Sequence, residues 1–103
     1  MTFFFVSKSR YQADVLYCRS YVYRIYTEDV NSDGIEAILD GAFKGYTIFR
    51  GEGRWKGKKE NSIVIEIEGT TRKRVLAVAK KIKAANKQEA VLVRRDKTDS
   101  RLI

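Results

Sequence analysis

The sequence has 103 residues, of which 44% are hydrophobic, and it contains one cysteine and no histidine or proline. This length and apolar content predict a single domain over residues 1–103 that folds on its own. One cysteine excludes an internal disulfide framework and CxxC metal sites, and the lack of histidine excludes Ser-His and Cys-His dyads. We therefore expect no catalytic residues, no metal site and no enzymatic activity, and the cysteine content favours a cytoplasmic location.

The net charge of +8 is distributed unevenly along the chain. Residues 1–68 contain ten basic and ten acidic side chains, whereas residues 69–103 contain eleven basic and three acidic ones. Such asymmetry favours an anionic partner, which can be a nucleotide, a nucleic acid or an acidic protein. A basic, solvated helix surface that aids solubility explains the same charges.

Residues 1–20 are expected to form an N-terminal extension, with a short edge strand over residues 3–6 and a turn over residues 8–13. The apolar start lacks a basic flank and is too short for a signal peptide or a membrane span, so no membrane association is expected. From residue 15 to residue 26, aromatic and β-branched residues predict a long strand.

The segment from Asp29 to Asp40 matches part of a calcium-binding loop. The match fails because Asp40 replaces the bidentate glutamate and a strand, not a helix, precedes the segment. A turn and a capping box, with Asp33 as N-cap and Glu36 three residues later, explain the same residues. The helix that follows has an apolar face made of Ile35, Ile38, Leu39, Ala42 and Phe43.

The segment from Gly45 to Gly69 predicts a β-hairpin, with strands over residues 46–49 and 62–68. The connection between them contains Gly51, Gly53 and Gly57 among basic residues. Glycines let backbone N–H groups approach an anion, and basic neighbours neutralise its charge, so the connection is expected to bind phosphate. A solvated hairpin loop would have the same composition.

A second helix is expected from a cap at Thr70 or Thr71 to about Asn86, with lysines on its outer side. Its buried stripe is predicted to contain Val75, Val78, Ala79, Ile82 and Ala85. Residues 90–93 predict a last strand. Residues 94–103 are expected to form a basic tail that becomes ordered only in contact with a partner.

These elements predict an α+β, ferredoxin-like βαββαβ fold with one antiparallel sheet, both helices on one face and the N-terminal strand as an extension. Side-chain alternation places Ile63, Ile65 and Ile67 under the helices and leaves Val64 and Leu92 on the open face. An open face that contains apolar side chains suits a subunit interface.

The hairpin also resembles the PII signalling-protein superfamily. The resemblance rests on Gly45-x-Thr47, on Gly51-x-Gly53-Arg54-x-Lys56-Gly57 and on a later Ile65-Glu66-Ile67 strand. The long loop of that family is reduced here to residues 58–61, and Trp55 stands where a ligand-contacting glutamine is expected. The resemblance implies a homotrimer that binds an adenine nucleotide (ATP, ADP or AMP), or another small anionic effector, between subunits and regulates a protein partner.

The same resemblance implies a set of ligand-binding residues. On the hairpin these are Thr47, Gly51, Gly53 and Lys56, with Arg54 adding charge beside them. Near the last strand they are Lys87, Arg94 and Arg95, which match the family by element and not by motif.

Two other functions remain open. Lys44-Gly45-Tyr46 resembles the start of an RNA-recognition signature, but Thr47 and Ile48 depart from it. A nucleic acid can still bind the basic helix and tail through its backbone. The third hypothesis is that the protein forms a structural or inhibitory oligomer that binds no ligand.

Overall fold

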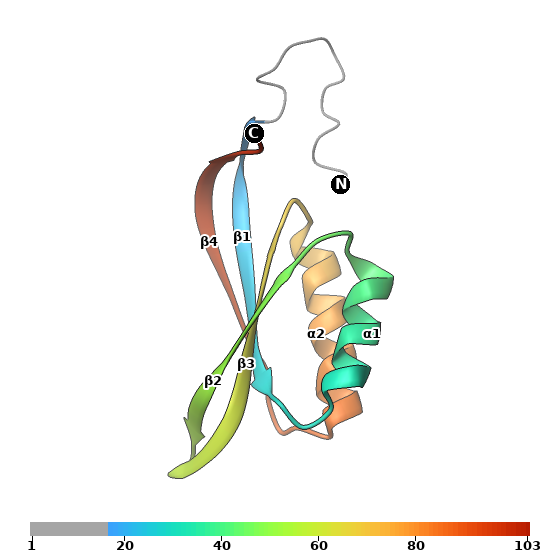
Figure 1. Cartoon of the computed structure of the whole chain (residues 1–103), viewed down its shortest axis with the longest axis vertical. Helices are drawn as coiled ribbons and strands as arrows, with labels where there is room; N and C mark the ends of the chain where they lie inside the picture. Colours follow the sequence, from blue (N-terminus) through green and yellow to red (C-terminus); the bar gives the residue numbers. More distant parts are fainter. Residues whose placement is uncertain (1–16) are drawn as a thin grey trace.

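A computed structural model of the protein describes residues 17–103. The strand expected over residues 3–6 and the turn expected over residues 8–13 lie outside the described residues. The six elements are β1 (Tyr17–Glu28), α1 (Ser32–Ala42), β2 (Thr47–Trp55), β3 (Lys58–Glu68), α2 (Arg72–Asn86) and β4 (Leu92–Arg101), shown in Figure 1.

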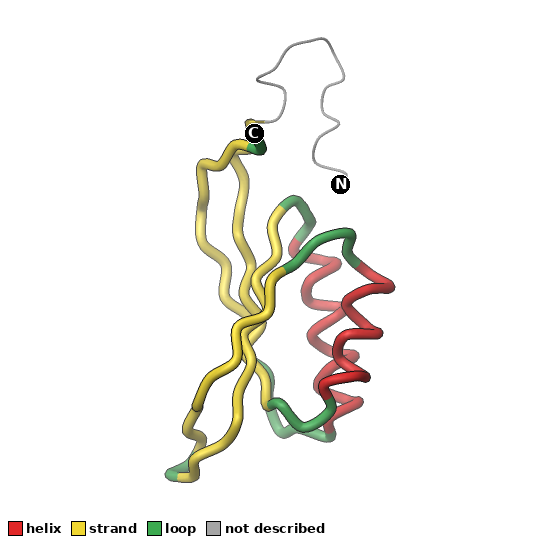
Figure 2. The backbone as a smooth tube through the Cα atoms, in the orientation of Figure 1, coloured by secondary structure: helices red, strands yellow, loops and turns green. Residues whose placement is uncertain are grey.

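The four strands form one antiparallel sheet in the order β2-β3-β1-β4, and both helices lie on one of its faces (Figures 1 and 2). This arrangement confirms the predicted α+β, βαββαβ fold. The register places Ile65 opposite both Ile25 on β1 and Ile48 on β2. Because successive side chains of a strand alternate between faces, this register turns Ile25 and Ile65 toward the helices together.

The core lies between the sheet and the two helices. The predicted inward position of the three β3 isoleucines is confirmed. Ala85 was expected in the buried stripe of α2 but is exposed, because it lies at the edge of that stripe in the last turn of the helix. The largest fully buried side chains are Ile25, Ile35, Leu39, Ile63, Ile65, Ile67, Val75 and Ile82.

The two helices begin differently. The predicted cap of α2 is confirmed at Thr71, whose Oγ1 accepts a hydrogen bond from the backbone N–H of Arg74 at 3.3 Å. The predicted capping box of α1 is wrong, because the N-cap is Asn31 and its side chain makes no cap hydrogen bond. Asp33 lies instead in the first turn, where its negative charge complements the helix dipole.

The hairpin differs most from the expectation. Strand β2 continues to Trp55 and β3 begins at Lys58, so the connection is a two-residue turn of Lys56 (φ 52°) and Gly57 (φ 80°). Gly51 and Gly53 lie inside β2, opposite Ser62 and Glu60. An extended strand points successive amides in opposite directions, so the glycines do not gather their N–H groups around an anion as expected.

The expected basic tail is part of the sheet. Strand β4 continues to Arg101 and pairs with β1 as far as Tyr17. The polar sequence forms a strand because the edge of β1 opposite β3 offers backbone hydrogen bonds from Tyr17 to Tyr26. An ion pair between Arg24 on β1 and Asp96 on β4, at 3.1 Å, adds to this pairing.

The sheet is longer than the helices that cover it. Eleven residues of β3 span about 37 Å as a strand, whereas fifteen residues of α2 span about 22 Å as a helix. The turn end of the hairpin therefore projects past one end of the helices, and the β1–β4 pair projects past the other (Figure 1). We call residues 53–60 the hairpin tip. Neither of the two helices in residues 17–103 has the length and apolar character needed to cross a membrane.

Candidate functional site

A hollow of about 620 Å³ lies where the hairpin tip approaches the loop between α2 and β4. Its volume falls within the range of about 300–1,000 Å³ that is usual for small-molecule sites. The hairpin tip contributes Gly53, Arg54, Trp55 and Glu60 to its walls. The remaining walls come from the end of β1, from Ser62 on β3 and from residues 87–92. We call this hollow the tip cavity.

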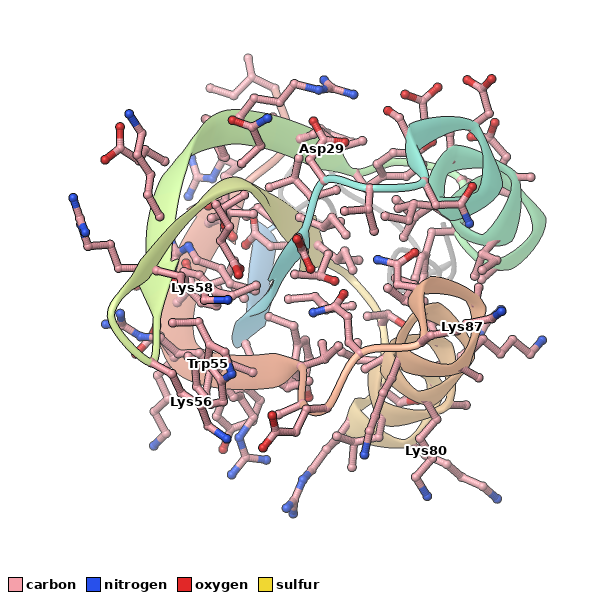
Figure 3. The ribbon with its side chains drawn as sticks, turned by 90° about the horizontal axis from the view of Figure 1, so that it is seen from below. Asp29, Trp55, Lys56, Lys58, Lys80 and Lys87 are labelled. Carbon is pink, nitrogen blue, oxygen red and sulfur yellow. The ribbon has the colours of Figure 1, made fainter. Side chains whose placement is uncertain are left out.

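An ion pair joins the two sides of the tip cavity. The Nζ atom of Lys56 lies 2.8 Å from Oε2 of Glu89 and 6.0 Å from the ring centroid of Trp55. Figure 3 views this end of the molecule, with Trp55 and Lys56 on the hairpin and Lys87 at the end of α2. Both partners of the ion pair are well exposed, so water competes with it and a ligand can displace it at little cost.

A polar network fixes the α2–β4 loop to the end of β1. Gln88 Oε1 accepts hydrogen bonds from the Thr27 hydroxyl, from Asn86 Nδ2 at 2.8 Å and from the backbone N–H of Glu28 at 3.3 Å. Thr27 is only 4% exposed, and Ser62 Oγ donates to its carbonyl oxygen at 3.3 Å. A partly buried and largely satisfied network of this kind holds the cavity wall in one conformation.

The loop begins with a left-handed residue. Lys87 caps α2 with φ 54° and ψ 43°, a conformation that usually favours glycine. The backbone N–H of Gln88 donates to the carbonyl oxygen of Lys83 at 3.0 Å, which satisfies the end of the helix. A lysine therefore adopts the left-handed conformation that glycine usually takes at the end of a helix.

The walls of the tip cavity are nearly balanced in charge. Glu28, Glu60 and Glu89 are acidic, and Arg54 and Lys87 are basic. The cavity also has aromatic walls, because Trp55 and Tyr26 line it and the Trp55 side chain is half exposed. Aromatic faces bind planar rings by stacking. The arrangement suits a ligand with a flat heterocycle and a few polar groups better than a highly charged anion.

The structure gathers part of the predicted ligand-binding set. Gly53, Arg54 and Lys87 line the tip cavity, and Lys56 contacts its wall through Glu89. Thr47 lies at the other end of β2, about 27 Å away for eight residues of strand. Gly51 stands between these ends and does not line the cavity.

The two arginines after the predicted last strand lie on opposite faces of β4. Arg94 forms an ion pair with Asp96 at 3.0 Å on the open face. Hydrogen bonding to Tyr26, followed by the charge of Asp96, raises the pKa of the Arg94 guanidinium. Arg95 stacks over the ring of Tyr21, at 4.3 Å from the centroid. Neither arginine lines the tip cavity.

Several residues of the cavity wall were missed from the sequence. Tyr26, Glu60, Gln88 and Glu89 line it but carry no motif. The signal that would have found Glu60 is the turn itself: a two-residue turn at Lys56-Gly57 places Glu60 directly opposite Gly53.

The open face of the sheet carries an apolar row that crosses all four strands. Phe49, Val64, Tyr26 and Leu92 lie opposite one another in the register. Phe49 is 52% exposed and Leu92 is 62% exposed. This confirms the outward position predicted for Val64 and Leu92. Tyr26 and Leu92 also line the tip cavity, so the apolar row and the cavity are continuous.

Solved structures share this fold at low sequence identity. CPII, a nitrogen regulatory PII-like protein from Thiomonas intermedia K12 bound to ADP, AMP and bicarbonate, is 19% identical with a TM-score of 0.61, over 84% of this chain and 99% of that one. A putative PII-like signalling protein from Thermus thermophilus is 16% identical with a TM-score of 0.54, over 82% of this chain and 90% of that one. The predicted PII-like fold is thereby confirmed.

An enzyme has the same fold. A phage SAM lyase in its apo state is 19% identical with a TM-score of 0.62, over 82% of this chain and 90% of that one. A phage SAM lyase in complex with S-methyl-5′-thioadenosine is 20% identical with a TM-score of 0.50, over 93% of this chain and 96% of that one. No family model and no curated protein matches this sequence. The fold is thus shared by regulatory proteins and by a lyase.

Proposed function

We propose that the protein is a PII-like trimeric regulatory module that binds a small adenosine-containing ligand in the tip cavity. The observation that carries the proposal is a hollow of about 620 Å³ that combines an aromatic wall at Trp55 with Arg54 and Lys87. Adenine stacks on the Trp55 ring, with a contribution of about 1–3 kcal/mol. Arg54 contacts the phosphate of ATP, ADP or AMP by charge-assisted hydrogen bonds, and Lys87 adds positive charge from the opposite wall of the cavity.

The ligands of the similar structures support the choice of adenosine. ADP, AMP and S-methyl-5′-thioadenosine, which occupy structures of this fold, all contain that group. The near balance of charge in the tip cavity favours a ligand with few phosphates, so we expect AMP and ADP to bind more tightly than ATP.

Three copies are proposed to cover one another's open faces. The apolar row of Phe49, Val64, Tyr26 and Leu92 is too exposed for a lone domain, and a closed ring of three removes it from water. Because Tyr26 and Leu92 belong to both the row and the cavity wall, a neighbouring copy would complete the ligand site. Light scattering should give a mass of three chains, and a concentration-independent monomer would contradict the assembly.

The regulatory step is proposed to act through the hairpin tip. A ligand that contacts Lys56 or Glu89 breaks their ion pair and changes the position of the tip relative to the α2–β4 loop. A cytoplasmic protein partner would detect that difference, since a ligand can only shift an equilibrium between states that it binds unequally.

Calorimetry with AMP, ADP, ATP and adenosine tests this function. Wild type should bind AMP or ADP, and Trp55→Ala should lose at least about fivefold in affinity for all four, because stacking is common to them. Arg54→Gln should weaken the nucleotides but leave adenosine unchanged. If no adenosine compound binds or raises the melting temperature of wild type, the proposal is wrong.

A second candidate is a SAM lyase, and Glu60 favours it. Three carboxylates and two aromatic rings line the tip cavity, a combination that attracts the positively charged sulfonium of SAM (S-adenosylmethionine). The protein would then be an enzyme, against our expectation from composition. Incubation with SAM decides between the two: release of S-methyl-5′-thioadenosine by wild type and its loss in Glu60→Gln would establish the lyase.

A further inference from the structure

The outward side of α2 carries a line of basic side chains. Only the last of them, Lys87, also lines the tip cavity of the proposed function. With 3.6 residues per turn, positions 73, 80 and 87 repeat every two turns and face away from the buried Val75 and Ile82. The segment from Gly69 to Gln88 contains no acidic residue. We call this set the basic stripe; it consists of Arg72, Lys73, Lys80, Lys83 and Lys87.

The charges of the basic stripe are not neutralised within the described part of the chain. On the strands and in the hairpin turn, Arg24, Arg50, Lys56, Lys59 and Arg94 each have a carboxylate within 3.5 Å. Among the described residues, no carboxylate oxygen lies within 4.0 Å of a side-chain nitrogen of the stripe, which is the distance limit for an ion pair. Figure 3 shows Lys80 and Lys87 on the α2 side of the molecule, away from the hairpin.

Helix stability does not explain this arrangement. Arg72 and Lys73 occupy the first turn of α2, which has no acidic residue. The N-terminus of a helix is the positive end of its dipole, so cations in that turn are unfavourable. A helix selected only for stability or solubility would carry acidic residues there, as α1 does with Asp33.

The neighbouring helix has the opposite charge. Asp33, Glu36 and Asp40 lie on α1, which has no basic residue between Ser32 and Ala42. A polyanion would be attracted along α2 and repelled by α1. The positive potential is therefore confined to α2 and does not extend over the whole face that the two helices form.

We propose that the basic stripe binds the sugar–phosphate backbone of a nucleic acid. An acidic protein would need an apolar centre in its interface, but the only large hydrophobic side chain exposed on α2 is Leu76, at 37%. Backbone binding needs only repeated cations, because it is driven by phosphate neutralisation and counterion release. The stripe runs along about 22 Å of helix, which spans several phosphates of one strand.

Fluorescence anisotropy with a labelled mixed-sequence DNA duplex and an RNA strand of equal length tests the proposal. The variant Lys73→Gln/Lys80→Gln/Lys83→Gln removes three stripe charges and leaves Lys87 of the tip cavity intact. It should weaken binding at least about tenfold and reduce the slope of log K against log salt by about two to three. The stronger of the two probes identifies the kind of nucleic acid.

The matched control is Lys44→Gln/Lys58→Gln/Lys97→Gln, which lowers the net charge by the same amount at exposed lysines outside α2. It should retain binding within about threefold. Equal losses in the two variants would mean that only net charge matters, and no binding by wild type at low salt would also overturn the proposal. Binding of polyglutamate as tight as that of the nucleic acids would assign the stripe to an acidic protein instead. Adenosine compounds should bind the stripe variant as they bind wild type, which separates this proposal from the function of the tip cavity.

Discussion

The ammonium group of Lys56 lies 2.8 Å from the carboxylate of Glu89 and connects the β2–β3 turn to the α2–β4 loop. Because the side chains are 65% and 63% exposed, we expect a double-mutant cycle with Lys56→Gln and Glu89→Gln to give a coupling energy below about 0.5 kcal/mol. Urea unfolding measures it. A coupling above about 2 kcal/mol would show that the pair is shielded from water, as a neighbouring subunit would do.

The turn residues themselves give a second prediction. Lys56 has a φ of 52°, which a lysine adopts at a cost and an asparagine adopts more easily. Lys56→Asn should therefore raise the free energy of unfolding by about 0.5–1 kcal/mol even though it removes the ion pair. Gly57→Ala, at φ 80°, should lower it by about 1 kcal/mol. A stabilising effect of Gly57→Ala would contradict this turn geometry.

The two strand glycines should respond differently to alanine. A Cβ atom at Gly51 meets no heavy atom within 4 Å, whereas one at Gly53 lies 3.1 Å from Cβ of Ser62. Gly51→Ala should change the unfolding free energy by less than about 0.5 kcal/mol, and Gly53→Ala should lower it by about 1 kcal/mol or more. Thermal denaturation compares them. Ser62→Gly should rescue part of the loss at position 53, and equal effects at both glycines would exclude the observed register.

Gln88 is expected to support the wall of the tip cavity. Gln88→Leu removes the acceptor of the Thr27 hydroxyl and of Asn86 Nδ2, and so should lower the free energy of unfolding by about 1–3 kcal/mol. Gln88→Glu keeps an acceptor oxygen at the same place and should lose less. Chemical denaturation of both variants, with ligand affinity measured alongside, checks this. An unchanged stability of Gln88→Leu would mean that water replaces the side chain.

The hydroxyl of Tyr46 should lose its proton at a higher pH than an ordinary tyrosine. Its hydroxyl donates to Oδ1 of Asp40 at 2.5 Å, and this hydrogen bond is the main cause that raises the pKa of Tyr46 from 10.0 to about 12. The raised pKa in the folded protein means that the contribution of Tyr46 to stability is complete below pH 10 and is lost as the pH rises to about 12. Ultraviolet titration should show one late tyrosine that disappears in Tyr46→Phe. In Asp40→Asn its pKa should fall back toward the ordinary value.

Much of the fold could be predicted because it depends on local periodicity. The alternation of Ile63, Ile65 and Ile67 determines which face of β3 meets the helices, and the hydroxyl of Thr71 marks the start of α2. The hairpin turn was misplaced because a glycine inside a strand looks the same in sequence as one in a loop. Lys56-Gly57 also lacks the asparagine or aspartate that usually identifies a two-residue turn.

The rest depends on contacts between distant residues. The polar residues of β4 show no strand periodicity of their own, and they become a strand because β1 offers a free edge. The wall of the tip cavity likewise depends on Thr27 and Gln88, which are 61 residues apart. The local hairpin motif could indicate Gly53, Arg54 and Lys56, but no local pattern could bring the α2–β4 loop to them.

The extension of the sheet beyond its helices has a consequence for local unfolding. Residues 53–60 include no buried side chain, so the amides of the hairpin tip can open to solvent without disrupting the core. Their hydrogen exchange should then require far less free energy than exchange of the β3 amides at Ile63 to Ile67. The candidate site thus lies on a part of the sheet that the core does not protect, where a bound ligand would change the opening equilibrium of the tip while leaving that of the core unaltered.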